Sequence, residues 1–233
     1  MRGCLFVLIV AALFVVGLAW FAGPPIASAL VGTTLTAAGL DATDLDVRVE
    51  ADPPILVAIG QADRVTIEGT DVDWDGLEAR SIDLTLDDVS LIGPSAAAVN
   101  GHLVGVELPG IDPPGSLATV AFEGPFDAAT TTVTIDGETV EAMALAAFEN
   151  TLGVRPAGAT LSEPNVIRIQ AGPVEVAGAL TIGPNGTVDV STPLGTATIV
   201  ELDPSLPVEL ASVAVEGDDL VLTGTIDLGE LLR

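Results

Sequence analysis

The chain has 233 residues, with 33 Asp and Glu against seven Arg and no Lys, and a net charge of −26. Nucleic acid is thereby excluded as a partner, because contacts to phosphates need basic side chains. The chain has one cysteine and one histidine, which excludes an internal disulfide and a zinc site built from Cys and His ligands. No nucleophile-elbow sequence accompanies the single histidine, His102, so a Ser-His-Asp triad is not expected. We predict no catalytic residue and no cofactor.

The first feature along the chain is an uncharged apolar run over residues 5–22. At about 1.5 Å per helical residue it is about 27 Å long, close to the thickness of a bilayer core. Arg2 precedes the run, and the next charge is Asp41. This asymmetry predicts a transmembrane helix or signal segment within residues 1–23, with the rest of the chain on the exported side of the cell membrane. Cleavage near Ala29 would instead release a secreted protein.

A helical stalk is predicted next, over residues 24–43. Its helical part is residues 25–39, where Thr33, Thr34 and Thr36 lower the helix propensity. The remaining residues, 44–233, are expected to form one β-rich domain.

From residue 44 onward, apolar and polar residues mostly alternate. Leu45, Val47 and Val49 alternate with Asp46 and Arg48, and the same period of two recurs through most of the chain. Such alternation predicts strands with one buried and one wet face, and the short connections favour antiparallel pairing. We therefore expect an α+β fold dominated by antiparallel strands.

Two stretches depart from this pattern. Residues 138–152 place Val140, Met143, Ala144, Ala147 and Phe148 on one helical stripe, after Asp136 as a cap, so we predict a helix there. Residues 93–116 are rich in Gly and Pro and predict a long surface connection.

An acidic run over residues 71–76 matches the opening half of a calcium loop. Its twelfth position is Ile82, where an EF-hand requires a bidentate Glu, so an EF-hand is excluded. An acidic turn is the favoured interpretation, and calcium binding by Asp71, Asp73 and Asp75 is the minor alternative.

Two parts of the chain resemble a known family. The sequences IGQADRVTIEGTDV at 59–72 and GLEARSIDLTLDDV at 76–89 look like the N-terminal half of the LmeA-like phospholipid-binding proteins. LPVELASVAVEGDDLVLTG at 206–224 looks like the end of those proteins. The resemblance implies a non-enzymatic envelope protein that binds phospholipid in an apolar cavity. It also implies a curved antiparallel sheet wrapped around one or two helices, similar to tubular lipid-binding domains.

A phospholipid or another acyl-chain ligand is therefore the expected partner, with a role in lipid or lipoglycan homeostasis or transfer. We predict that the cavity wall is formed by helix residues facing strand residues: Met143, Ala147 and Phe148 facing Ile82, Leu84, Leu86 and Phe122. Arg64 and Arg80 are candidate headgroup contacts. Two alternatives stay open at this point: a β-rich interaction module without a cavity, and an envelope hydrolase that uses paired carboxylates.

Overall fold

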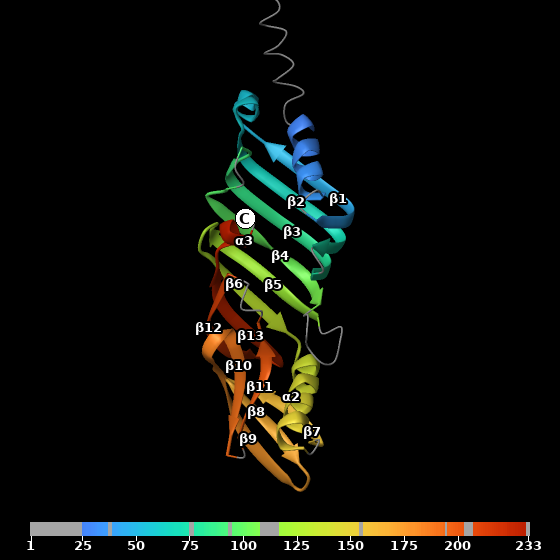
Figure 1. Cartoon of the computed structure of the whole chain (residues 1–233), viewed down its shortest axis with the longest axis vertical. Coiled ribbons are helices and arrows are strands. Elements are labelled where there is room, and N and C mark those ends of the chain that lie inside the picture. Colours follow the sequence, from blue (N-terminus) through green and yellow to red (C-terminus); the bar gives the residue numbers. More distant parts are fainter. Residues whose placement is uncertain are drawn as a thin grey trace, which may run out of the picture.

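The computed structural model describes residues 25–36, 39–74, 77–92, 95–107, 117–153, 156–193, 195–202 and 207–231. Two antiparallel sheets follow one another along the long axis of the molecule (Figure 1). This arrangement confirms the predicted β-dominated, antiparallel class. The larger sheet is open, because its edge strands β1 and β12 do not pair with each other.

Eight strands form the larger sheet. In order across the sheet they are β1 (Leu40–Glu50), β2 (Gln61–Trp74), β3 (Leu77–Ser90), β4 (Ala98–Glu107), β5 (Leu117–Pro125), β6 (Ala129–Ile135), β13 (Asp219–Ile226) and β12 (Val208–Glu216). The second sheet runs β11 (Gly195–Glu201), β10 (Thr187–Thr192), β9 (Val174–Ile182), β8 (Val166–Ala171) and β7 (Gly158–Ser162). The helical elements are residues 25–36, η1 (Pro54–Ile59), α2 (Gly137–Leu152), η2 (Pro184–Gly186) and α3 (Leu228–Leu231).

Bulges bend the larger sheet where the chain can adopt positive φ. The register of β1 shifts around Asp44, which has φ 54°, and that of β4 shifts at Gly105, which has φ 68°. Aspartate and glycine tolerate this left-handed region better than most residues. Because bulges increase local twist, they let the sheet curve toward the helices on its inner face, the face that carries Val65, Ile67 and Ile82.

The expectation of a long connection over residues 93–116 is wrong for its first half, because β4 occupies 98–107. Val99, Leu103 and Val106 of this strand are buried. Gly101 takes the inward position between the first two, and the bulge at Gly105 shifts the third out of register, so the period of two is hidden in the sequence. Gly101 itself is required, since a Cβ there would lie 2.1 Å from the carbonyl oxygen of Asp83.

Helix 25–36 packs against the inner face of the larger sheet. Its residues Ala27, Val31 and Leu35, spaced by four, join the apolar cluster of β1, β2 and β3. The Ser28 hydroxyl accepts a hydrogen bond of 3.0 Å from the backbone N–H of Val49 on the edge strand β1. The helix is therefore part of the folded body. The predicted boundary between residues 43 and 44 falls inside β1.

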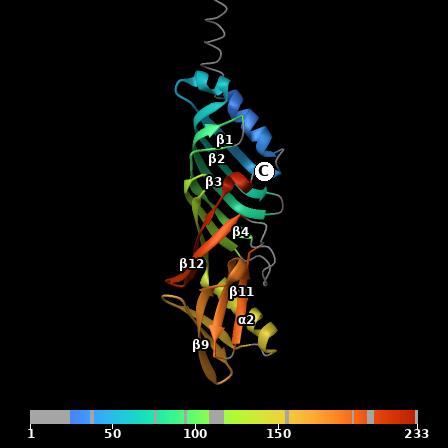
Figure 2. The same cartoon turned by 60° about the vertical axis from the view of Figure 1, so that its left-hand side comes forward.

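Helix α2 confirms the predicted helix almost to the residue. Asp136 caps it by accepting a 2.9 Å hydrogen bond from the N–H of Thr139, and Gly153 ends it with φ 69°. Figure 2 shows α2 beside the second sheet, away from β1 and β2. Its buried residues Val140, Met143, Ala144 and Phe148 form one core with strands of both sheets.

Replacing Asp136 by alanine should lower the free energy of unfolding by about 1 kcal/mol, whereas asparagine should retain most of the stability that the cap contributes.

Partial burial raises the pKa of Asp136, but the hydrogen bonds from Thr139 outweigh this effect and hold that pKa below its ordinary value. The extra stability from the charge is therefore present at neutral pH and is lost as the pH falls through the lowered pKa. Urea unfolding of the three proteins at neutral and acidic pH checks this, and an equal loss in both variants would contradict the cap.

Among the residues described here, no helix is both long and apolar enough to cross a membrane. The apolar run of residues 5–22 lies outside them.

Candidate functional site

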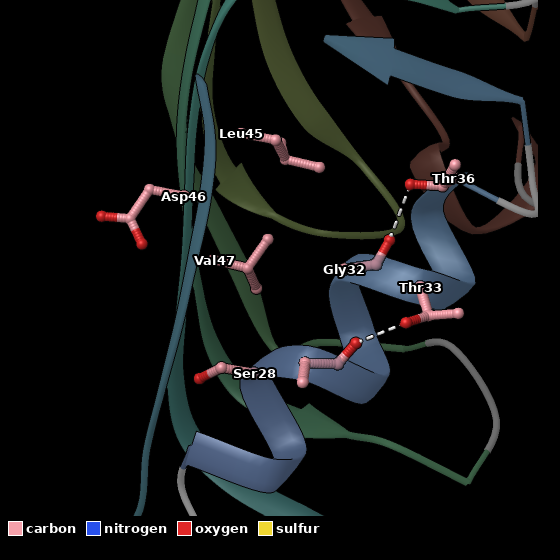
Figure 3. Close-up of a pocket in the computed structure, with 8 residues that line it drawn as sticks. Ser28, Gly32, Thr33, Thr36, Leu45, Asp46 and Val47 are labelled. Carbon is pink, nitrogen blue, oxygen red and sulfur yellow. Dashed lines mark hydrogen bonds between the residues drawn. The ribbon is translucent and has the colours of Figure 1, made fainter. Parts of the chain in front are cut away.

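An open groove of about 730 Å³ separates helix 25–36 from the edge strand β1 (Figure 3). The helix contributes Ser28, Ala29, Gly32, Thr33 and Thr36, and the strand contributes Leu45, Asp46 and Val47. A volume of this size falls within the range that small-molecule sites occupy in proteins.

The groove has an aliphatic wall and a wall of small residues. Leu45 and Val47 point from β1 toward the helix, whereas Asp46 points away to the other side of the strand (Figure 3). On the helix, the hydroxyls of Thr33 and Thr36 donate to carbonyl oxygens four residues earlier, at 2.7 and 3.1 Å. Because both hydroxyls already donate hydrogen bonds to the backbone, this wall of the groove does not require a ligand with polar groups.

Gly32 brings the two walls close together. A Cβ at this position would lie 3.8 Å from Cγ2 of Val47, an ordinary van der Waals distance with nothing nearer. The absence of a side chain at Gly32 therefore leaves space that a larger residue would fill.

The inner face of the sheet continues the apolar surface beyond the groove. Leu84 and Leu86 on β3 and Phe122 on β5 are half-buried there. Leu228 of α3 packs against the same apolar cluster as these three side chains. Helix 25–36 and α3 therefore share one apolar face, with partly buried apolar side chains between them.

The structure divides the predicted cavity wall into two separate groups. Ile82, Leu84, Leu86 and Phe122 lie together on the inner face of the larger sheet. Met143, Ala147 and Phe148 belong to the core at the other end of the molecule, where α2 packs on β7, β11 and β13 rather than on β3. The helix that does lie near the first group is helix 25–36.

The two arginines predicted to contact a headgroup start from the opposite face of the sheet. Arg64 follows the strand alternation away from buried Val65, and its Nε donates to Asp87 at 2.9 Å. Arg80 is exposed next to buried Ala79, with its side chain lying over Gly105. A headgroup role for Arg64 and Arg80 stays a prediction.

Arg48 is also engaged outside the groove, by Asp46 and Glu68. Its hydrogen bond to Asp46, with the charges of Asp46 and Glu68, raises the pKa of Arg48 above its ordinary value. Arg48, Arg64 and Arg80 are all absent from the residues that line the groove.

The acidic run does not form a metal loop in the described part of the chain. Asp71 and Asp73 belong to β2, which continues to Trp74, and Asp75 lies outside the described residues. No group of three potential metal ligands occurs among the residues described.

Sequence reasoning missed the groove residues of helix 25–36. A signal was present: Ser28, Ala29, Gly32, Thr33 and Thr36 are all small, and they share one helical face beside the apolar stripe of Ala27, Val31 and Leu35. A helical face of small residues lets β1 lie close to the helix and still leaves space for a ligand between them.

A family model matches most of the chain. No curated protein and no solved structure matches the chain. The model of the LmeA-like phospholipid-binding family matches residues 16–225, which is most of the chain. The chain therefore belongs to the LmeA-like phospholipid-binding family.

Proposed function

We propose that this protein binds a phospholipid through an acyl chain that lies in the groove between helix 25–36 and β1. Membership of a phospholipid-binding family supports lipid as the ligand. The groove is the observation that carries the site, because it offers aliphatic side chains, small residues and satisfied hydroxyls over about 730 Å³. These are the walls that a hydrocarbon chain requires.

The acyl chain, rather than the headgroup, is the part recognised. Arg64 pairs with Asp87 and Arg48 pairs with two carboxylates, all on the other face of the sheet. The net charge of the whole chain is strongly negative, which disfavours the approach of anionic headgroups. We therefore expect the phosphate to remain in water at the open side, with little selectivity among zwitterionic headgroups.

The site is on the exported side of the cell membrane, and the N-terminal segment is retained as an anchor. Cleavage near Ala29 would remove Ala27, which is buried, and Ser28, whose hydroxyl holds the N–H of Val49. A groove-forming helix that lost its first turn would also lose part of the groove wall. In this position the protein would serve lipid or lipoglycan homeostasis, or lipid transfer.

Retention of the anchor predicts that protein isolated from membranes has an intact mass that still includes the residues before Leu30. A chain that begins at residue 30 should be less stable by about 1–3 kcal/mol, because the Val49 N–H loses its partner. Intact mass spectrometry and urea unfolding measure the two effects. A mature N-terminus near residue 30 with unchanged stability would contradict the anchor.

Lipid extraction tests the proposed function directly. Full-length protein purified in detergent and exchanged into lipid-free buffer should retain phospholipid, identified by mass spectrometry of an organic extract. The stripped protein should also take up added phosphatidylcholine. If no lipid co-purifies and none is taken up, the groove has no lipid-binding role, and a β-rich interaction module becomes the better description.

A further inference from the structure

Three segments at one end of the molecule carry no charged side chain. Helix 25–36, residues 53–60 around η1, and residues 89–92 at the end of β3 contain no Asp, Glu, Arg or Lys. This is unusual in a chain with 33 carboxylates. Helix 25–36 and η1 lie at the same end in both views (Figures 1 and 2).

The same end displays large apolar side chains to solvent. Six large hydrophobic residues are exposed in the described part of the chain, and five of them belong to these three segments. We call those five the apolar tip: Ile26, Leu30, Ile55, Ile59 and Ile92. Ile92 is the most exposed of them, at 79%. The sixth, Val174, begins β9 in the second sheet, at the other end of the molecule.

The apolar tip rests on a packed base. Val57 of η1 and Leu91 pack against the apolar cluster that contains Ala27. The Leu91 N–H donates to the Gly60 carbonyl oxygen at 2.8 Å, and the Gly60 N–H donates to the Val57 carbonyl oxygen at 3.0 Å. Ile92 lies directly over Gly60, where a Cβ would meet its side chain at 2.2 Å. The exposed residues are thus presented by an ordered surface.

We propose that the apolar tip docks into the interface of a lipid bilayer, so that the acidic remainder of the molecule projects away from the membrane. The uncharged apolar run of residues 5–22 ends three positions before helix 25–36, so the tip is the end of the folded body next to the predicted anchor. Anionic headgroups repel the acidic surfaces more strongly than these three uncharged segments. Isoleucine and leucine side chains insert shallowly at the boundary of headgroups and acyl chains.

Docking would place one open end of the groove at the membrane surface. Ile26 and Leu30 share a helix with Ser28, Ala29 and Gly32 of the groove wall. A lipid could then pass between leaflet and groove without crossing the charged surface. The docking itself does not depend on a lipid in the groove, so the two proposals can fail separately.

Depth-dependent quenching tests the docking on the full chain. Cys4, the only cysteine, is replaced by serine, and a small environment-sensitive fluorophore is attached to Ile92→Cys or to the matched control Val174→Cys. Both proteins are reconstituted into phosphatidylcholine vesicles that contain a lipid with a spin label near the top of its acyl chain. The label at position 92 should be quenched at least about threefold more than the label at 174.

Second variants separate docking from mere tethering by the anchor. Ile55→Ser with Ile59→Ser should reduce quenching at position 92 by about half or more, whereas Val174→Ser should leave it unchanged. Equal quenching at 92 and 174 would overturn the proposal. So would quenching at 92 only by a headgroup spin label, or a change at 92 that depends on protein concentration without vesicles, which would indicate self-association. Gly32→Leu should not alter quenching, because it affects only the groove.

Discussion

Leucine at position 32 should strongly reduce lipid loading while the protein remains folded. A Cβ on Gly32 meets Val47 at an ordinary 3.8 Å, so the branched end of leucine has to lie in the groove between helix 25–36 and β1. The helix itself gains, because leucine is favoured over glycine in a helix interior by about 0.5–1 kcal/mol. We expect at least about a fivefold reduction in bound phospholipid, since the leucine side chain obstructs the groove between Gly32 and Val47, across which an acyl chain would have to lie.

Alanine at position 32 is the matched control for this experiment. It brings a similar gain in helix propensity and adds one methyl group, so the groove stays open and lipid loading should remain close to that of the unmodified protein. Mass spectrometry of organic extracts quantifies the lipid in all three proteins, and circular dichroism verifies that they are folded. If the leucine variant carries as much phospholipid as the alanine variant, the ligand does not lie beside Gly32.

Truncation of Phe148 to alanine should cost about 3–5 kcal/mol of unfolding free energy, as expected for a large side chain removed from a closed core. Phe148 is 2% exposed and packs with Ile167, Leu180 and Leu222 from both sheets. This loss is a large share of the stability of about 5–15 kcal/mol that is typical of a folded protein. Urea unfolding with a spectroscopic probe measures it.

Lipid loading, unlike stability, should not change in the Phe148→Ala protein. Because Phe148 lies in the core around α2 and away from helix 25–36, the Phe148→Ala protein should retain its phospholipid under conditions where it is folded. The control Phe148→Leu should lose less stability, since most of the volume is conserved. A folded Phe148→Ala protein that has lost its lipid would place the ligand near α2, as the sequence had predicted.

Some elements follow from local sequence alone. The apolar stripe of residues 138–152 with Asp136 before it defines α2, because a cap and a helical period are encoded within a few turns. The alternation around Leu45, Ile82 and Val213 likewise places these residues in strands β1, β3 and β12. Where glycine occupies inward positions, as at Gly101 in β4, the period disappears although the strand remains.

The candidate site depended on information that local patterns lack. An amphipathic helix and an alternating strand each show which face is buried, but not which other face covers it. The sequence suggested that α2 covers β3, yet α2 packs on β7, β11 and β13, and helix 25–36 lies over β1 and β2. This choice depends on how the chain returns from the second sheet through β12 and β13 to pair with β6.

The sequence by itself therefore determined the β-dominated class, α2, the strongly negative net charge, and the family to which the chain belongs. These properties depend on local sequence or on composition, so they can be recognised without knowledge of the fold. Only the tertiary structure decided that helix 25–36 is part of the folded body, that a groove opens beside Gly32, and that the charge-free segments gather at one end. Those features arise from contacts between residues far apart in the chain, which no periodicity records.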